Sequence, residues 1–273
     1  MFLGVALLAG ALGAIVGVGG GVILIPVLTL FGVDVRLAAG ASLMSVIATS
    51  SGAASAYVRE RLTNLKVAIF LEMFTSAGAV LGALLQGVLP TPLLHFLFAA
   101  ALVGSGIGLV LRHRLEKSSP AESPSSSPLA RRLEMPGTYH DPATGELVSY
   151  EVRRLSLGSA MMFGAGAISG LLGIGSGALK VPAMDLALGM PTKASSATSN
   201  FMIGVTACAS VGAYAARGQP VPGLIMPVVL GSAVGSFVGT RLLARLRSGA
   251  IRLVFLLVLG AMTVEMIVRG LHG

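Results

Sequence analysis

The stretch Gly17-Val-Gly-Gly-Gly21, followed by Pro26, is the most informative part of the chain, because it interrupts a run of residues apolar enough to lie in a membrane. A second copy, Gly173-Ile-Gly-Ser-Gly177 with Pro182, interrupts a similar run in the other half. In lipid, non-helical backbone is tolerated only where it is buried or lines a cavity, since every N–H and C=O group needs a partner. Paired breaks at corresponding positions of two halves therefore predict the substrate site of a transporter.

The composition is that of an integral membrane protein. Hydrophobic residues make up 54% of the 273 residues and charged residues only 11%, against roughly 25% charged in ordinary soluble domains. The formal net charge of +8 resides in short loops and helix ends, where basic residues set membrane orientation, so we expect no nucleic-acid partner. We expect the chain to lie in the lipid bilayer of the cell membrane.

Apolar stretches predict the membrane segments. Six of them have about the length of one helix that spans the roughly 30 Å hydrocarbon core. The first stretch of each half is longer: residues 2–31 as one straight helix would extend about 45 Å, so the chain must break or fold back there. We interpret residues 2–16 as mature structure rather than a cleaved leader, because no basic region precedes them. The stretches are 2–31, 37–57, 65–89, 92–112, 157–188, 194–216, 222–244 and 250–269.

The two halves are related by an internal repeat. Residues 9–21 match residues 165–177 at six of thirteen positions. Less common residues also pair at one offset, which chance identity in a Gly- and Ala-rich chain does not explain. These pairs are Tyr57 with Tyr214, Phe98 with Phe255 and Arg112 with Arg269. The predicted organisation is a first repeat over 1–112, a polar linker over 113–155 and a second repeat over 156–273.

The basic residues distinguish two topologies. If each broken segment crosses the membrane, the halves are parallel, and the Lys and Arg residues outside the breaks divide as 12 on one side against 6. If each broken segment is a re-entrant hairpin followed by three crossings, the halves are inverted and the division is 15 against 3. The positive-inside rule favours the second. It predicts an all-α integral membrane protein of two inverted repeats, with a cytoplasmic linker and both termini outside.

The linker has two parts. Residues 118–128 are rich in Ser and Pro and are typical of a flexible connector. Turn residues Asp141, Pro142 and Gly145 then precede an alternating run that resembles one arm of a small β-hairpin. This part is either a solvated connector or an element that docks a partner or regulates the protein.

The breaks predict an anion site. Half-helices over 22–31 and 178–188 would each begin near the middle of the bilayer, where free N–H groups and the helix dipole attract an anion. Alternatively, the glycines only permit close helix crossing, as we expect for Gly231, Gly235 and Gly239. The candidate site residues at the breaks are Gly19, Gly20, Gly21, Gly175, Ser176 and Gly177.

Lys180 lies in the first turn of the second half-helix, where a cation opposes the helix dipole and is expensive at membrane depth. It therefore needs an anionic partner, which is either Asp185 or a bound anion. Its equivalent in the first half is Leu24. Glu72 in the third segment is the better candidate to carry a coupling proton, because Glu265 lies one turn from Arg269 and can pair with it.

Polar side chains after each break provide further hydrogen-bond donors for the predicted anion site. Ser42, Ser199 and Asn200 are the candidates for contact with sulfonyl or carboxyl oxygens. The alternative is that they form interhelical hydrogen bonds. No cofactor or metal is expected: the four histidines lack ligand spacing, and the first glycine cluster lacks the third glycine of a dinucleotide site. No nucleophile and base recur at workable spacing, so we expect no enzyme.

The doubled pattern Gly-x-Gly-Gly-Gly-x(4)-Pro and Gly-x-Gly-Ser-Gly-x(4)-Pro, followed by Ala41-Ser-Leu and Thr198-Ser-Asn, resembles the TauE/SafE sulfite exporter family of membrane permeases. The resemblance covers both halves. It implies transport, usually outward, of a sulfur-containing anion such as sulfite, a sulfonate such as sulfoacetate, or thiosulfate. Ser176 and the long central insert depart from the pattern and leave the substrate open.

Three functions remain. The first is a secondary transporter of a small anion that works by alternating access, driven by an ion gradient or by the gradient of the substrate, since no nucleotide-binding P-loop is present. The second is a passive anion channel, which the same half-helices would support. The third is a non-transporting scaffold whose linker docks a partner. A homodimer is compatible with all three.

Overall fold

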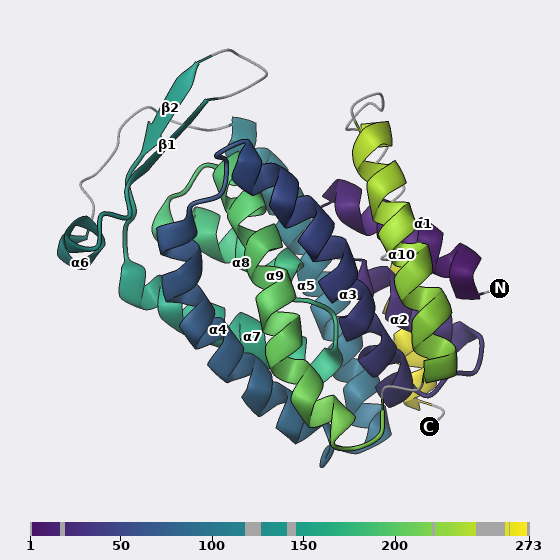
Figure 1. Cartoon of the computed structure of the whole chain (residues 1–273). Helices are drawn as coiled ribbons and strands as arrows, with labels where there is room; N and C mark the ends of the chain where they lie inside the picture. Colours follow the sequence, from purple (N-terminus) through teal and green to yellow (C-terminus); the bar gives the residue numbers. More distant parts are fainter. Residues whose placement is uncertain are drawn as a thin grey trace.

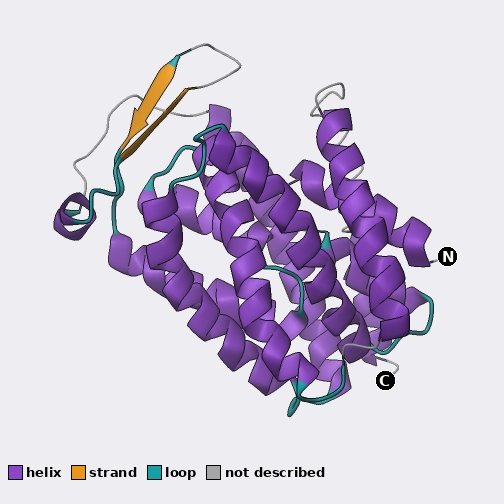
Figure 2. Cartoon of the chain, in the orientation of Figure 1, coloured by secondary structure: helices purple, strands orange, loops and turns teal. Residues whose placement is uncertain are grey.

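The computed structural model describes residues 2–16, 20–117, 127–140, 146–219, 222–243, 260–261 and 263–271. These residues are almost entirely helical, with one pair of short strands (Figures 1 and 2). The elements are α1 (Phe2–Val16), α2 (Gly21–Leu30), α3 (Val35–Arg59), α4 (Leu65–Gln86), α5 (Thr91–Lys117), α6 (Pro128–Arg132), β1 (Gly137–His140), β2 (Leu147–Tyr150), α7 (Leu155–Leu172), α8 (Gly177–Ala183), the π-helical turn η1 (Met184–Leu188), α9 (Thr192–Ala215) and α10 (Pro222–Leu243). Residues 263–271 are also helical, whereas most of the predicted segment 250–269 lies outside the described residues.

The outer surface of the bundle is apolar. Among the described helices, α3, α4 and α7 are long and apolar enough to cross a membrane. The large exposed side chains of α4 include Ile69, Met73, Val80 and Leu84. Exposed faces as apolar as these fit contact with lipid rather than water. The structure therefore agrees with an all-α membrane protein.

The first apolar segment of the second half is a helical hairpin. α7 runs to Leu172, and after the break α8 and η1 return toward the start of α7. The N–H group of Arg153, just before α7, donates to the carbonyl oxygen of Leu188 at 2.9 Å. A side chain at Gly158 would meet that of Leu188. Both ends of this hairpin therefore lie together.

The first half also folds back. A Cβ atom at Gly20 would lie 3.1 Å from the carbonyl oxygen of Ala9. A straight helix from Ala9 to Gly20 would separate these residues by about 16 Å. Each long apolar segment therefore turns back on itself, as its length requires.

The two halves make equivalent contacts with each other. In each contact a glycine allows two helix backbones to approach, and an added Cβ atom would overlap the facing backbone. The pairs are Gly78 with Phe163, Gly235 with Leu7, Gly166 with Thr75 and Gly10 with Ser232. The first two pairs correspond when the halves are exchanged, and so do the last two. The prediction that Gly231 and Gly235 serve close helix crossing is confirmed, because both face backbone of α1; the side-chain surroundings of Gly239 are not described.

The equivalent helices α3 and α9 run in opposite directions. At one end of α3, the N–H group of Asn64 donates to Thr198 Oγ1 near the start of α9, at 3.1 Å. At the other end, Gly40 of α3 lies against Gln219, which follows α9. Helices α3 and α9 are therefore antiparallel neighbours, as Figure 1 also shows.

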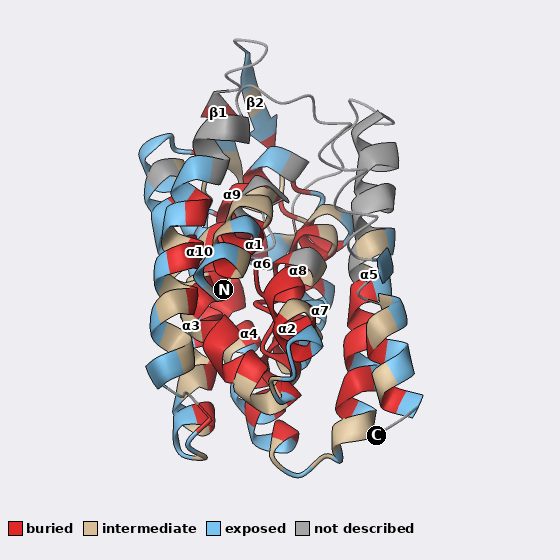
Figure 3. Ribbon diagram, turned by 90° about the vertical axis from the view of Figure 1, so that its right-hand side faces the viewer, coloured by how far each residue is buried: buried red, intermediate tan, exposed pale blue. Residues whose placement is uncertain are grey.

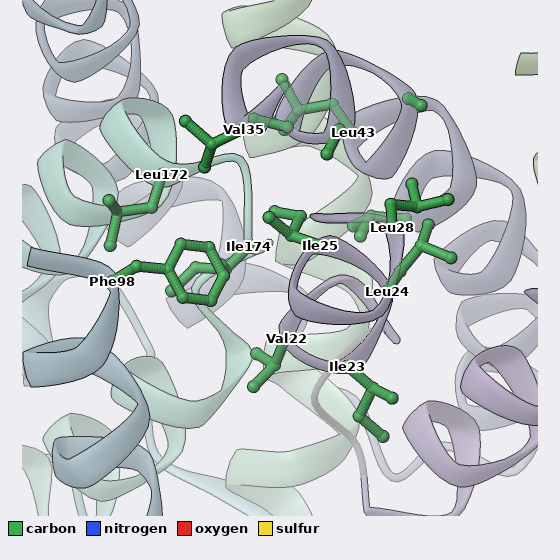
Figure 4. Close-up of a cluster of buried hydrophobic side chains, with 14 of the residues drawn as sticks. Val22, Ile23, Leu24, Ile25, Leu28, Val35, Leu43, Phe98, Leu172 and Ile174 are labelled. Carbon is green, nitrogen blue, oxygen red and sulfur yellow. The ribbon is translucent and has the colours of Figure 1, made fainter. Parts of the chain in front are cut away.

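Helix α2 lies inside the bundle. It packs against α1 and α3, with Ile174 of the second break and Phe98 of α5 in the same hydrophobic cluster (Figure 4). Figure 3 shows buried residues along the middle of the molecule and exposed ones on the outer helices. A helix that is apolar on all sides is stable only when it is surrounded by protein or lipid. The buried hydrophobic residues of α2 include Val22, Ile23, Leu24, Ile25 and Leu28.

The described part of the linker is folded against one end of the bundle. β1 and β2 pair antiparallel, at the place where the sequence predicts one arm of a hairpin. The side-chain amide of Asn64, in the loop between α3 and α4, donates to the Met135 carbonyl oxygen at 2.8 Å and to the Tyr150 hydroxyl at 2.9 Å. Met135, Tyr150 and Val152 are buried in a cluster with residues of α4, α7 and α9. This part is therefore docked on the bundle and is more than a solvated connector.

The exposed rim of the linker carries an ion pair. The Lys66 ammonium lies 2.6 Å from the Glu134 carboxylate, and its hydrogen bond holds the pKa of Glu134 below its usual value. Burial raises the pKa of the Tyr150 hydroxyl, so this hydroxyl stays neutral at physiological pH and can bond to Asn64.

Candidate functional site

The second helix break is built from residues with left-handed backbone. Gly173 and Gly175 have φ angles of +74° and +76°, and Ser176, the N-cap of α8, has a φ of +33°. The Ser176 carbonyl oxygen accepts hydrogen bonds from the N–H groups of Leu179 and Lys180, at 3.0 and 2.9 Å. A serine in this conformation stores about 1–3 kcal/mol of strain, which persists only where the surroundings hold it.

The first break has the same construction. Gly20 is the N-cap of α2 with a φ of +71°, and its carbonyl oxygen accepts hydrogen bonds from the N–H groups of Ile23 and Leu24. Gly20 and Ser176 are equivalent in the repeat, so the two half-helices begin alike. Gly19, a predicted site residue, lies outside the described residues.

The two breaks touch each other through α3. The Ser42 hydroxyl of α3 donates to the carbonyl oxygen of Gly173 at 2.9 Å. A Cβ atom at Gly21 would lie 2.5 Å from Ser42 Oγ and 3.0 Å from the carbonyl oxygen of Ile174. A Cβ atom at Gly175 would likewise meet the Val46 side chain. The structure therefore brings Gly21, Ser42 and the second break together, although they are far apart in the sequence.

Two buried serine hydroxyls at these breaks have no hydrogen-bond partner among the described residues. They are those of Ser176, 1% exposed, and Ser199, 0% exposed. Ser199 lies one turn before Ile203, which faces Gly175, so it lies on the side of α9 near the second break. Leaving a buried hydroxyl unpaired costs about 1–3 kcal/mol. Each hydroxyl is a donor that an oxyanion can satisfy.

The remaining predicted donors have local partners. The side-chain amide of Asn200 donates to the carbonyl oxygen of Ser196 at 3.0 Å, one turn earlier in α9. The N–H group of Gly177 donates to the carbonyl oxygen of Gly175 within the break. The Asn200 amide is therefore bonded within its own helix, whereas Gly177 forms part of the break itself.

Lys180 lies in a buried polar cluster between three helices. Its ammonium, 0% exposed, lies 3.5 Å from Glu72 Oε2 of α4 and donates to the Thr206 hydroxyl of α9. The Thr206 hydroxyl is 2.6 Å from Glu72 Oε1, and the Ser76 hydroxyl donates to the same oxygen at 2.7 Å. The cluster therefore connects the half-helix α8 to α4 and α9.

This cluster gives Lys180 a partner that the sequence does not predict, since the expected partners are Asp185 or a bound anion. The carboxylate that contacts Lys180 is Glu72, at 3.5 Å, and Asp185 has an interaction of its own. Thr206 is absent from the sequence-based site, although a threonine at membrane depth, repeated as Thr49 in the first half, is the signal that could have indicated it. The predicted pairing of Glu265 with Arg269 is confirmed, at 2.8 Å.

Metal ligands do not gather in the described ranges: no group of three or more His, Cys, Asp or Glu residues there could hold a metal ion. The polar groups at the breaks are hydroxyls, carbonyls and one ammonium. The hydroxyls and the ammonium are donors that suit a small anion with several oxygen acceptors, whereas the carbonyl oxygens can only accept hydrogen bonds.

Comparison with known proteins identifies related membrane proteins. The model of the family "Sulfite exporter TauE/SafE" matches residues 2–266. The probable membrane transporter protein YunE of Bacillus subtilis is 25% identical over 275 residues, covering 98% of this chain and 96% of that protein. The probable membrane transporter protein YdhB of the same organism is 27% identical over 235 residues, covering 86% of each chain. No solved structure matches the chain.

Proposed function

Because this chain belongs to the TauE/SafE sulfite exporter family, we propose that it is a secondary transporter that moves a small sulfur-containing anion out of the cell. The candidate substrates are sulfite, a sulfonate such as sulfoacetate, and thiosulfate. The observation that supports this most directly is the contact between the two helix breaks, beside which the buried hydroxyls of Ser176 and Ser199 have no partner among the described residues. An oxyanion has the acceptor atoms that these donors need.

Charge recognition in this proposal comes from Lys180. Its N–H group bonds to the Ser176 carbonyl oxygen, so the ammonium belongs to the first turn after the break. An ammonium has three donors, and the described residues occupy two of them, with Thr206 and Glu72. The third donor is available to the anion.

The proposed topology is inverted, with the linker in the cytoplasm and the termini outside. Two observations support it: equivalent helices α3 and α9 run antiparallel, and the inverted arrangement places 15 basic residues on one side against 3. The hairpins of α1 with α2 and of α7 with α8 are then re-entrant, and they approach from opposite sides of the membrane. Alternating access would arise from movement of α1 and α10 as one pair relative to α4 and α7 as another.

Cysteine labelling checks this topology. After replacement of Cys208 by serine, a cysteine placed at Gly273 is expected to react with an impermeant maleimide added to intact cells. A cysteine placed at Ser125 is expected to react only after the cells are opened, because the linker is cytoplasmic. Reaction at Ser125 but not at Gly273 in intact cells would reverse the orientation, whereas the same result at both positions would indicate parallel repeats.

Transport assays separate this proposal from its alternatives. In proteoliposomes, a transporter is expected to show saturable uptake and counterflow with at least one of sulfite, thiosulfate and sulfoacetate. Flux that rises linearly with concentration and shows no counterflow would indicate a passive channel. Absence of both flux and ligand-dependent thermal stabilisation for all three anions would favour the non-transporting scaffold.

Ser176→Gly is expected to stabilise the protein by about 1–2 kcal/mol, since glycine adopts the left-handed conformation without strain. It is expected to weaken anion binding about tenfold, because one hydrogen-bond donor to the anion is lost. The measurements are thermal unfolding in detergent and equilibrium binding. Arg61→Gly is the matched control, since Arg61 also has a positive φ, of 56°, in a loop away from the breaks. An unchanged affinity of Ser176→Gly for the anion would show that the Ser176 hydroxyl does not contact the anion.

A further inference from the structure

We propose that Glu72 and Lys180 form a proton-coupling site, at which binding of the anion near the second break is accompanied by uptake of a proton on Glu72. The inference rests on the proposed function above and deepens it, because it names the coupling ion and the group that carries it. The anion and the proton would then cross the membrane together, so export would be driven by the outward gradient of the anion, and an imposed proton gradient would move the anion in the same direction as the proton.

The two oxygens of the Glu72 carboxylate differ in their surroundings. Oε1 receives hydrogen bonds from Thr206 and Ser76, at 2.6 and 2.7 Å. Among the described residues, the hydrogen-bond partner of Oε2 is the Lys180 ammonium, at 3.5 Å. This distance is longer than the 2.7–2.9 Å typical of a charge-assisted bond. Oε2 is therefore the oxygen with room for a proton, and the ion pair with Lys180 is loose.

The cluster lies within about one helical turn of the second break. Lys180 follows the break at the fourth position of α8. On α9, Ile203 faces Gly175 in the break, and Thr206 lies three positions further along the same side of the helix. An anion at the break is thus close enough to attract the Lys180 ammonium away from Glu72.

Charge balance connects the two events. Both members of the ion pair are buried, Lys180 at 0% and Glu72 at 7% exposure. A buried carboxylate without its counter-charge is expensive, and binding a proton removes this cost. When the anion takes over the Lys180 charge, a proton from water binds Glu72 Oε2 and converts the carboxylate to the neutral acid. By linkage, protonation of Glu72 strengthens anion binding by the same factor by which anion binding strengthens the binding of a proton to Glu72.

Other charged groups on the neighbouring elements do not replace Glu72. Helix α7 has no charged residue. Asp185 of η1 has interactions of its own, and so does Lys193 at the exposed start of α9. Lys66 of α4 pairs with Glu134 of the linker, and His95 lies in the first turns of α5. Of the described side chains, Glu72 is the carboxylate in contact with Lys180.

The test measures protons taken up per anion bound. Purified full-length protein in weakly buffered detergent solution is mixed with thiosulfate, and in a second series with sulfoacetate, while an indicator dye reports the pH. These probes do not themselves bind a proton near neutral pH. The wild type is expected to take up about one proton per bound anion. For Glu72→Gln, the number of protons taken up per bound anion is expected to be smaller by a factor of about five or more. In proteoliposomes, an inward proton gradient is expected to drive anion accumulation by the wild type and not by Glu72→Gln.

Glu265→Gln is the matched control, because Glu265 is another carboxylate in an apolar helix and pairs with Arg269. It is expected to keep the wild-type proton uptake. If Glu72→Gln does not fold, the pH dependence of anion affinity in the wild type replaces it: the affinity is expected to rise as the pH falls, and an affinity independent of pH would overturn the coupling.

The outcomes separate the two proposals. Anion binding by the wild type without proton uptake overturns the coupling site but leaves the transporter. Undiminished uptake in Glu72→Gln, or loss of uptake in Glu265→Gln alone, also overturns it. Failure of the wild type to bind either probe contradicts the proposed function and therefore also the coupling site.

Discussion

Lys180→Met is expected to destabilise the folded protein by about 3–5 kcal/mol, because it leaves a buried carboxylate without its counter-charge. The Lys180 side chain is 0% exposed and that of Glu72 is 9% exposed, so water cannot replace the lost ammonium. Thr206 and Ser76 would remain as donors to one carboxylate oxygen only. The measurement is thermal unfolding of the purified protein in detergent.

The double variant Lys180→Met with Glu72→Gln is expected to recover most of this loss. Replacing a buried ion pair by neutral groups of similar volume is often neutral for stability, whereas removing one partner is not. The two single variants and the double variant form a cycle that isolates the interaction. Lys66→Met provides the control, since it removes one member of an exposed pair and should change stability little. A Lys180→Met protein as stable as the wild type would contradict the observed pairing.

Gly21→Ala is expected to abolish transport while leaving a folded protein. Gly21 is the first residue of α2, where alanine is acceptable to the backbone, but the added methyl group would enter the contact between the two breaks. It would lie 2.5 Å from Ser42 Oγ and 3.0 Å from the Ile174 carbonyl oxygen. The breaks would have to separate, and the donors beside them would lose their alignment. Counterflow in proteoliposomes measures the effect.

Two glycine controls accompany this variant. Gly52→Ala in α3 has no atom within 4 Å of the added carbon, so it should preserve transport and stabilise the helix by about 0.5–1 kcal/mol. Gly235→Ala would overlap the backbone of Leu7, so it should separate α1 from α10 and lower the folded yield. Gly20 is a poorer position for this test, because its φ of +71° makes any side chain there strained. Normal transport by Gly21→Ala would show that the breaks are only packing devices.

The composition of the linker does not reveal that part of it is buried against the bundle. Residues 113–155 read as polar and connector-like, yet Met135, Tyr150 and Val152 are buried against the bundle. Asn64, which lies in a different loop, donates to both Met135 and Tyr150. A short alternating strand is detectable from its own residues, but its docking surface belongs to helices elsewhere in the chain.

The membrane class, the two breaks and the equivalence of the halves follow from composition, segment length and spacing. These properties are local, because each backbone group in lipid must find a partner within its own segment or beside it. The glycine clusters that predict the breaks contain Gly20 and Ser176, and in the structure these two residues are the N-caps of α2 and α8.

The pairing of side chains between helices was settled by packing. Glu72 and Lys180 are 108 positions apart, and Ser42 and Gly173 are 131 apart. The helical period places a residue on one side of its own helix, but it does not say which neighbour that side will meet. That choice depends on how α4, α8 and α9 rotate and cross, which the glycine contacts between the halves control. For this reason the lysine could be recognised as needing an anionic partner, whereas the partner itself emerged only from the folded bundle.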